Sequence, residues 1–258
     1  MKILALQGSP RTNGFTQMVL SKFLEGAAAK GAESEIIWLA QKKINACTGC
    51  YSCWFKHPGK CIHQDDMPQI LEKLRLADVW VWATPLYHFS MTSYAKRCLE
   101  RTIPLVEPFL IESAGLTTHP YRYPELASKK IVLISVCGFP EKEHFSALVE
   151  NFRLLAQAGR WALAGVLLRP GAETLIFLEK LGKRGEAVMS GFLQAGQEIV
   201  EKGEISKEVE NIVSQEWTHN RPFFREQANL FMQKRIEYEE RLRKGEEKRS
   251  FAEYSAGA

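Results

Sequence analysis

The chain has 258 residues and is 45% hydrophobic, which is enough apolar material for a buried core in one domain with an extension. Its 34 basic and 30 acidic residues leave a net charge of +4, without the concentrated basic stripe of nucleic-acid-binding proteins. The longest apolar runs are strand-sized, and the apolar start ends at Gly8-Ser9-Pro10, too early for a signal peptide. We therefore expect a cytoplasmic protein with neither a nucleic-acid nor a membrane partner.

Apolar runs typical of β-strands alternate along the chain with segments of helical periodicity. The predicted strands are 2–7, 35–39, 79–83, 131–136 and 162–168. The predicted helices that alternate with them are 15–30, 67–76, 92–101, 143–158 and 173–202. Because continuous apolar strands alternating with helices indicate a parallel sheet buried on both faces, the pattern predicts an α/β doubly wound fold.

The chain divides into a predicted sheet domain at 1–202 and a helical extension at 203–258. Two segments of the first domain stand apart: a cysteine-rich loop at 44–64 and a proline-rich excursion at 103–128, of the kind that forms lids or interfaces. The extension contains two more predicted helices and a frayed tail. These three segments are 206–216, 225–244 and 250–258.

The loop after the first predicted strand is rich in small and hydroxyl-bearing residues. It runs Gly8-Ser9-Pro10-Arg11-Thr12-Asn13-Gly14-Phe15-Thr16 into a predicted helix, whose free N–H groups and dipole favour an anion. The loop is neither a Walker A sequence nor G-x-G-x-x-G, and its hydroxyls and amide suit a terminal monophosphate. An ordinary Ser-Pro turn with a Thr16 cap is the alternative. The position beside the first strand favours a ligand site, because doubly wound sheets bind ligands there.

Four cysteines lie in one short segment with the spacing C-x2-C-x2-C-x7-C. They are Cys47, Cys50, Cys53 and Cys61. Four thiolates from a compact loop with overlapping C-x2-C pairs are typical of [4Fe–4S] ligation. A structural zinc site more often separates two C-x2-C pairs by a dozen residues or more, and disulfides or unliganded thiols are a third interpretation. The spacing favours the cluster over zinc and over no metal.

The chain resembles a known family. Gly8-Ser9-Pro10-Arg11 followed by Gly14-x-Thr16 is similar to the phosphate loop of the flavodoxin-like NAD(P)H-dependent FMN reductases, and within these most to the iron–sulfur flavoproteins. The similarity covers most of residues 1–200 and includes the Cys-Thr-Gly-Cys run, Asp65-Asp66-Met67 and the segment 83–87. Members usually carry Asn where this chain has Phe15, which leaves only the backbone N–H of that position for phosphate.

The resemblance implies a five-stranded sheet in the order 2-1-3-4-5, an FMN cofactor and a [4Fe–4S] cluster on the four cysteines. Some family members that resemble the cysteine motif are flavin reductases without an established cluster. The implied FMN contacts come from the first loop and from the loops after the third and fourth strands. They are Ser9, Arg11, Asn13, Gly14, Phe15, Thr16, Pro85, Leu86, Tyr87, His88, Phe89, Cys137 and Gly138.

The loops at 85–89 and 137–138 suit a flavin ring for chemical reasons. An isoalloxazine needs an apolar or aromatic wall and backbone donors where reduction places negative charge. Gly138 permits a close backbone approach, whereas Cys137 is expected to be a buried apolar residue. A lone histidine such as His88 is more often structural than a proton donor. We therefore expect no catalytic side chain, because the flavin does the chemistry.

These features predict an oxidoreductase that moves electrons from NAD(P)H or a ferredoxin-like donor through FMN and the cluster to a small-molecule or protein acceptor. A two-electron NAD(P)H:quinone, nitro or FMN reductase without a cluster is one alternative. A non-enzymatic electron carrier or redox sensor is the other. A homodimer or homotetramer is expected from the aromatic residues of the extension, although a helical cap on the same chain would also use them. These residues are Trp217, Phe223, Phe224, Phe231 and Tyr238.

Overall fold

The computed structural model describes residues 1–177, 181–218 and 220–246. It divides the chain into two compact units, Met1–Gln215 and Glu216–Ala258. The predicted tail at 250–258 lies outside the described residues, as does part of the predicted helix at 173–202.

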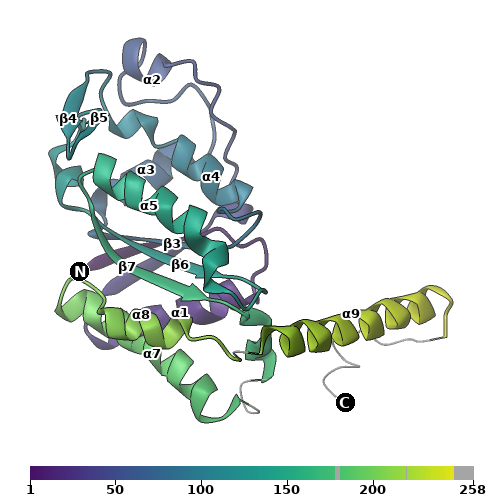
Figure 1. Ribbon diagram of the computed structural model, residues 1–258. Helices are drawn as coiled ribbons and strands as arrows, with labels where there is room; N and C mark the ends of the chain where they lie inside the picture. The colour runs from purple at the N-terminus through teal and green to yellow at the C-terminus, as the bar shows by residue number, and fades with distance from the viewer. Residues whose placement is uncertain (178–180, 219, 247–258) are drawn as a thin grey trace. The chain divides into compact units, whose positions relative to one another are not determined.

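Five parallel strands form the sheet of the first unit, and they follow the order β2-β1-β3-β6-β7 (Figure 1). They are β1 (Lys2–Gln7), β2 (Glu33–Trp38), β3 (Val79–Pro85), β6 (Lys130–Val136) and β7 (Ala162–Arg169). With these five strands numbered consecutively, the order is 2-1-3-4-5. The flavodoxin-like doubly wound fold predicted from the sequence is confirmed.

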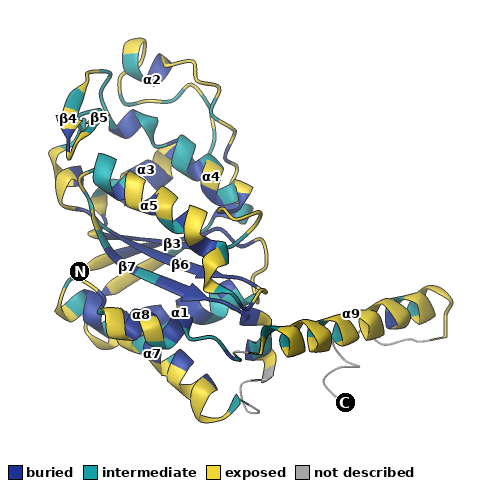
Figure 2. Ribbon diagram, viewed as in Figure 1, coloured by how far each residue is buried: buried dark blue, intermediate teal, exposed yellow. Residues whose placement is uncertain are grey.

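Helices cover both faces of this sheet (Figure 1). They are α1 (Phe15–Ala29), α3 (Met67–Leu76), α4 (Ser93–Glu100), α5 (Ser146–Ala158), α7 (Lys183–Glu201) and α8 (Lys207–Ser214). Helices α3, α4 and α5 lie on one face, where they pack in one core with Leu4, Trp80 and Leu133 of alternate strand positions. Helices α1, α7 and α8 lie on the other face. Figure 2 shows the central strands β3 and β6 as buried, which explains their continuous apolar sequence, whereas the first half of the edge strand β2 is exposed.

The excursion at 103–128 contains structure that the sequence interpretation missed. A short hairpin pairs β4 (Ile111–Ser113) with β5 (Leu116–Thr118), and 3-10 turns flank it at Ile103–Leu105 and Pro124–Ser128. The residues between the two strands, Ala114 and Gly115, both have positive φ, at 48° and 80°. Two consecutive residues of positive φ are typical of a tight hairpin turn, but strands of three residues give too little alternation to detect.

The remaining short elements are η1 (Leu39–Gln41), α2 (Ser52–Phe55), η4 (Lys142–Phe145) and η5 (Ala172–Phe177). In the second unit, α9 (Arg221–Arg243) begins earlier than the predicted 225. The Asn220 side chain accepts a hydrogen bond from the N–H of Phe223, and Pro222 occupies the first turn. Both are helix-start signals that explain the earlier boundary.

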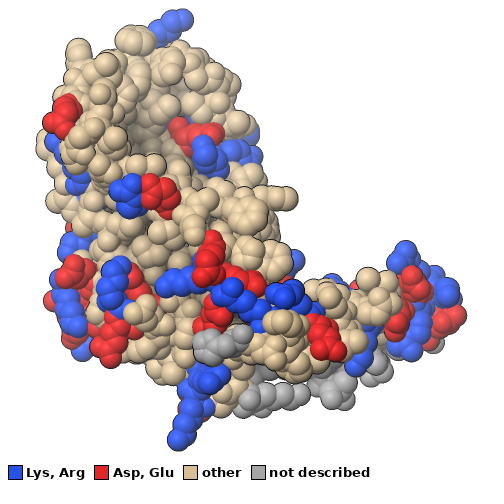
Figure 3. Space-filling view, viewed as in Figure 1, with Lys and Arg blue, Asp and Glu red and all other residues tan. Residues whose placement is uncertain are grey.

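Charges of both signs are mixed on the surface. On the drawn residues of the face in Figure 3, basic and acidic side chains alternate over α8 and again over α9, and neither helix carries a large area of one sign there. None of the helices within the described ranges is long and apolar enough to cross a membrane.

Helices α1 and α7 cross in backbone contact at two glycines. A Cβ atom at Gly26 would lie 1.8 Å from the carbonyl oxygen of Leu193, and one at Gly196 would lie 1.9 Å from that of Phe23. A methyl group at either site must push the helices apart. We expect Gly196→Ala to lower the free energy of unfolding by about 1–3 kcal/mol despite alanine's better helix propensity.

Urea unfolding followed by circular dichroism measures this loss. The matched control is Ala28→Val, which adds carbon atoms to the exposed face of α1 and should cost less than about 1 kcal/mol. Equal stability of Gly196→Ala and the wild type would contradict the close crossing.

Candidate functional site

The carboxyl ends of β1, β3, β6 and β7 meet at one edge of the sheet, where their following loops enclose a cleft of about 180 Å³. This is the edge at which doubly wound folds bind ligands. The cleft is lined by residues from four separate chain segments. They are Ser9, Arg11, Gly14, Phe15, Thr16, Pro85, Leu86, Tyr87, Val136, Cys137, Gly138, Ala172 and Glu173.

One end of the cleft has the properties of an anion site. Gly14 is the N-cap of α1, and within the described structure no side chain caps this helix start and no acidic residue occupies its first turn. Ser9 and Thr16, which both carry hydroxyl groups, line the cleft beside this helix start, and both residues are buried. The Ser9 hydroxyl accepts a hydrogen bond from the N–H of Arg11 at 3.2 Å, which fixes the loop. Free helix N–H groups beside two hydroxyls fit a phosphate monoester.

The other walls of the cleft come from the loops after β3 and β6. The N–H of Leu86 donates to the carbonyl of Val136, so the two loops are joined directly. The N–H of Tyr87 donates to the carbonyl of Ser90. The backbone N–H groups of Leu86 and Tyr87 are therefore both used within the protein, and neither is free for a ligand. Apolar atoms of Pro85 and Leu86 are therefore what this loop offers to a flat ring. Burial raises the pKa of the Cys137 thiol, which suits an apolar wall and not a nucleophile.

The cleft brings together most of the residues expected from the sequence, but three of them lie outside its lining: Asn13, His88 and Phe89. His88 and Phe89 both have positive φ and form the turn beyond Tyr87. In the other direction, the sequence interpretation missed Val136, Ala172 and Glu173. The available signal was the Pro170-Gly171 pair after the fifth strand, because every strand of a parallel sheet ends at the same edge.

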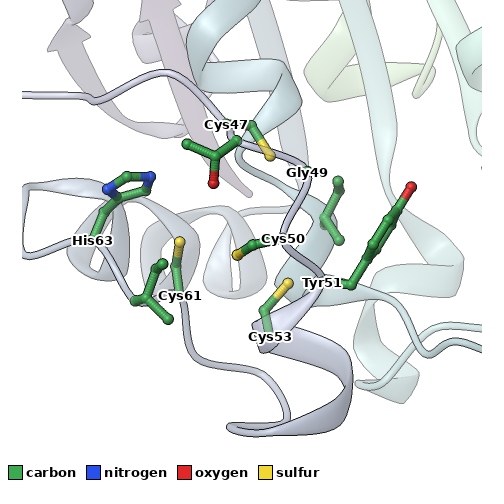
Figure 4. A pocket seen from close by; sticks show the side chains of 10 residues that line it. Cys47, Gly49, Cys50, Tyr51, Cys53, Cys61 and His63 are labelled. Carbon is green, nitrogen blue, oxygen red and sulfur yellow. The ribbon is translucent and has the colours of Figure 1, made fainter.

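The four clustered cysteines line a second pocket, which is formed by the loop at 44–64 (Figure 4). In Figure 4 the sulfur atoms of Cys47, Cys50, Cys53 and Cys61 face a common space, with His63 at one side. All six cysteines of the chain are free thiols, so the disulfide interpretation does not describe this structure. Among the described residues, no group of three or more His, Cys, Asp or Glu side chains has the arrangement of a metal-ion site.

Local backbone conformation turns the thiols inward. Gly49 and Tyr51, on either side of Cys50, have φ of 64° and 54°. Glycine adopts this left-handed region freely, whereas a tyrosine there is uncommon and is typically held by surrounding contacts. The Tyr51 ring stacks on Trp54 at 5.0 Å, and the Trp54 indole N–H donates to the carbonyl of Val106 in the excursion at 103–128. The excursion therefore fixes the cysteine loop.

The thiols of this pocket differ in acidity. A backbone hydrogen bond from Ser52 and one from the Thr48 side chain lower the pKa of Cys50. Burial raises the pKa of Cys53, and the nearby Cys61, Cys50 and Cys47 raise it further. Burial and the neighbouring cysteines therefore oppose ionisation of Cys53, and a positively charged metal centre, which binds thiolates and releases their protons, would offset that opposition.

Comparison with known proteins identifies the family. The family model described as NADPH-dependent FMN reductase matches residues 1–159. The chain belongs to this family. The resemblance noted from the sequence is thereby confirmed, and membership makes the chain a relative of flavin-dependent oxidoreductases.

Several curated proteins that match this chain are named iron–sulfur flavoproteins. One from Methanocaldococcus jannaschii is 37% identical over 105 residues, which make up 41% of this chain and 53% of that protein. One from Archaeoglobus fulgidus is 34% identical over 104 residues, covering 40% of this chain and 46% of that protein. The chain thus matches only about half the length of each.

Solved structures share the fold of this family member at low identity. An NAD(P)H:quinone oxidoreductase from Methanothermobacter marburgensis has a TM-score of 0.55 at 17% identity, over 77% of this chain and 96% of that one. An FMN-dependent NADH-azoreductase from Bacillus anthracis has a TM-score of 0.55 at 13% identity, over 78% of this chain and 99% of that one. These matches support the fold alone.

Proposed function

We propose that the chain is an FMN-dependent oxidoreductase that takes electrons from NAD(P)H or a ferredoxin-like donor and passes them through a [4Fe–4S] cluster to an acceptor. The observation that carries the flavin part is the uncapped start of α1 beside the Ser9 and Thr16 hydroxyls, at one end of a cleft with apolar walls. A monophosphate with a flat ring attached fits that arrangement.

In this proposal the loop at Ser9, Arg11 and 14–16 holds the FMN phosphate, and 85–87 with 137–138 holds the ring. FMN, when bound, supplies hydride acceptance and electron transfer. The protein contributes position and shielding. Pro85 and Leu86 exclude water from one side, and Gly138 leaves room for close approach because it has no side chain.

The cysteine pocket fits a cluster by its donor set. Cys47, Cys50, Cys53 and Cys61 offer four thiols facing one space, and iron–sulfur clusters are held by four thiolates. A cluster, when bound, supplies one-electron transfer. The names of the curated relatives support this part of the proposal.

We further propose that the chain forms a homodimer or homotetramer in the cytoplasm. Helix α9 exposes large apolar side chains in its own unit, namely Phe223, Leu230, Met232 and Ile236. Exposed apolar residues in such number are typical of interfaces. Size-exclusion chromatography with light scattering should give a multiple of the single-chain mass, and a monomer at micromolar concentration would contradict the assembly.

A spectrum, an iron assay and NADH or NADPH oxidation on anaerobically purified protein test the function. We expect flavin bands, broad thiolate-to-iron absorbance and nucleotide oxidation with an added quinone or nitroaromatic acceptor. Flavin without iron, but with turnover, would support the two-electron reductase instead. Flavin without turnover of either nucleotide would favour a ferredoxin-like donor or an electron carrier, and failure to bind FMN would contradict the proposal as a whole.

A further inference from the structure

A buried ion pair closes the neck of the cysteine loop. The side chains of Arg101 and Asp65 are 1% and 0% exposed, and they pair through two contacts, Nη1–Oδ2 at 2.7 Å and Nη2–Oδ1 at 3.0 Å. Arg101 also donates to the carbonyl of Asn45 at 2.8 Å. Asp65 in turn accepts the N–H groups of Asn45 and Met67. The pair therefore joins both ends of the loop to the end of α4.

Asp65 is fully used within this network, but Arg101 is not. Its Nε is buried and has no hydrogen-bond partner among the described residues. Buried N–H groups without partners are rare in folded proteins and call for an explanation such as an absent ligand. A second buried nitrogen without a partner, Nε2 of His63, belongs to a residue that lines the cysteine pocket itself.

The side chains that act on Arg101 include one of the pocket cysteines. Burial lowers the pKa of Arg101, but Asp65 and the side chain of Cys61 together raise it above its ordinary value. Cys61 is one of the four cysteines that line the pocket. Arg101 thus stands between the carboxylate of Asp65, which it neutralises, and one of the pocket cysteines, and its Nε is the atom that has no partner.

We propose that Arg101 is a positioning residue for the metal centre in the cysteine pocket, with its Nε–H reserved for the Cys61 sulfur and its buried charge favouring the reduced centre. This inference rests on the proposed function. A cluster held by these cysteines would take up one electron from reduced flavin and no proton, so its negative charge would grow by one. A buried guanidinium stabilises that added charge, and hydrogen bonds to sulfur and local charge set cluster potentials.

A purely structural role for the Arg101–Asp65 pair predicts a different result. If the pair only closed the loop, Arg101→Gln and Asp65→Asn would perturb the centre in the same way, because each breaks the same contact. If charge acts on the centre, the two substitutions move its midpoint potential in opposite directions. Removing the cation disfavours reduction, and removing the anion that neutralises it favours reduction.

The test is a potentiometric titration of the full chain, purified anaerobically with FMN and monitored by electron paramagnetic resonance, together with iron per chain. We expect Arg101→Gln to lower the equilibrium constant for one-electron reduction at least tenfold, which shifts the midpoint potential down by about 59 mV. We expect Asp65→Asn to raise the midpoint potential. Arg97→Gln is the matched control. It removes the same charge one turn earlier in α4, where Arg97 donates to the neck carbonyl of Ile44, and should shift the midpoint much less.

Loss of one partner of a buried pair can prevent folding. Arg101→Met with Asp65→Leu removes both charges at similar volume, so the two opposite shifts should partly cancel, and a midpoint lowered by less than about 59 mV in that double variant would support the inference. Iron-loaded variants whose midpoints match Arg97→Gln, or shift in the same direction, would overturn it while leaving the cluster intact. Absence of iron from the wild type would overturn both the cluster proposal and this inference.

Discussion

Replacing Ser9 with aspartate is expected to abolish useful FMN binding. Ser9 is buried at the end of the cleft where the uncapped start of α1 would meet the phosphate. A phosphate monoester carries about 1.5–2 negative charges near neutral pH. Two unit charges 4 Å apart interact by about 4 kcal/mol at an effective dielectric of about 20. Allowing for partial solvent screening, we expect FMN affinity to fall at least about 100-fold, or roughly 2.7 kcal/mol.

Isothermal titration of the flavin-free protein measures this loss, and two comparisons make it specific. Ser9→Asn has nearly the same shape as aspartate without the charge, so it should lose about tenfold or less. Riboflavin lacks the phosphate, so Ser9→Asp and Ser9→Asn should bind it equally. If the two variants lost FMN to the same degree, the phosphate would not lie at this loop.

The fold could be predicted because its signals are local and repeated. Continuous apolar strands such as β3 and β6 are recognisable wherever they lie, since both faces of a central strand are buried. The hairpin at 111–118 was missed because its three-residue strands carry almost no periodicity. The long helix predicted from 173 in fact begins with a 3-10 turn, and α7 starts only at Lys183.

The residues of the candidate sites also differ in whether the sequence alone reveals them. The loop at 8–16 and the four cysteines are contiguous, so their chemistry can be read directly from the sequence. Glu173 and Arg101 reach their sites only through folding. Glu173 belongs to the turn after β7, and Arg101 lies 36 positions from its partner Asp65. Their roles depend on which elements become neighbours, and spacing carries no such information.

The two pockets are physically separable. Their linings share no residue among those that the structure describes, and each is anchored to different elements. The cysteine pocket is fixed by Asp65, Arg101 and the Trp54 contact with Val106, whereas the cleft depends on the ends of the strands. A change in one pocket should therefore leave ligand binding in the other intact, which makes single substitutions informative.

Replacing Cys50 or Cys61 with serine is expected to remove the metal centre while FMN binding persists. The hydroxyl of serine does not ionise at neutral pH and cannot replace a thiolate ligand, so iron should fall from about four per chain to well below one. Inductively coupled plasma mass spectrometry of iron and zinc, with FMN affinity from titration, measures both halves of the prediction.

The matched control for these variants is Cys98→Ala. Cys98 is fully buried in α4, and burial raises the pKa of its thiol to about 12, so it is an inert core residue. Its replacement should retain iron and FMN at a modest cost in stability. Stoichiometric zinc in the wild type would contradict the cluster and indicate a structural zinc site at these cysteines. Iron that survives serine substitution at Cys50, Cys53 and Cys61 would show that it binds elsewhere, since the pocket would then keep a single thiol.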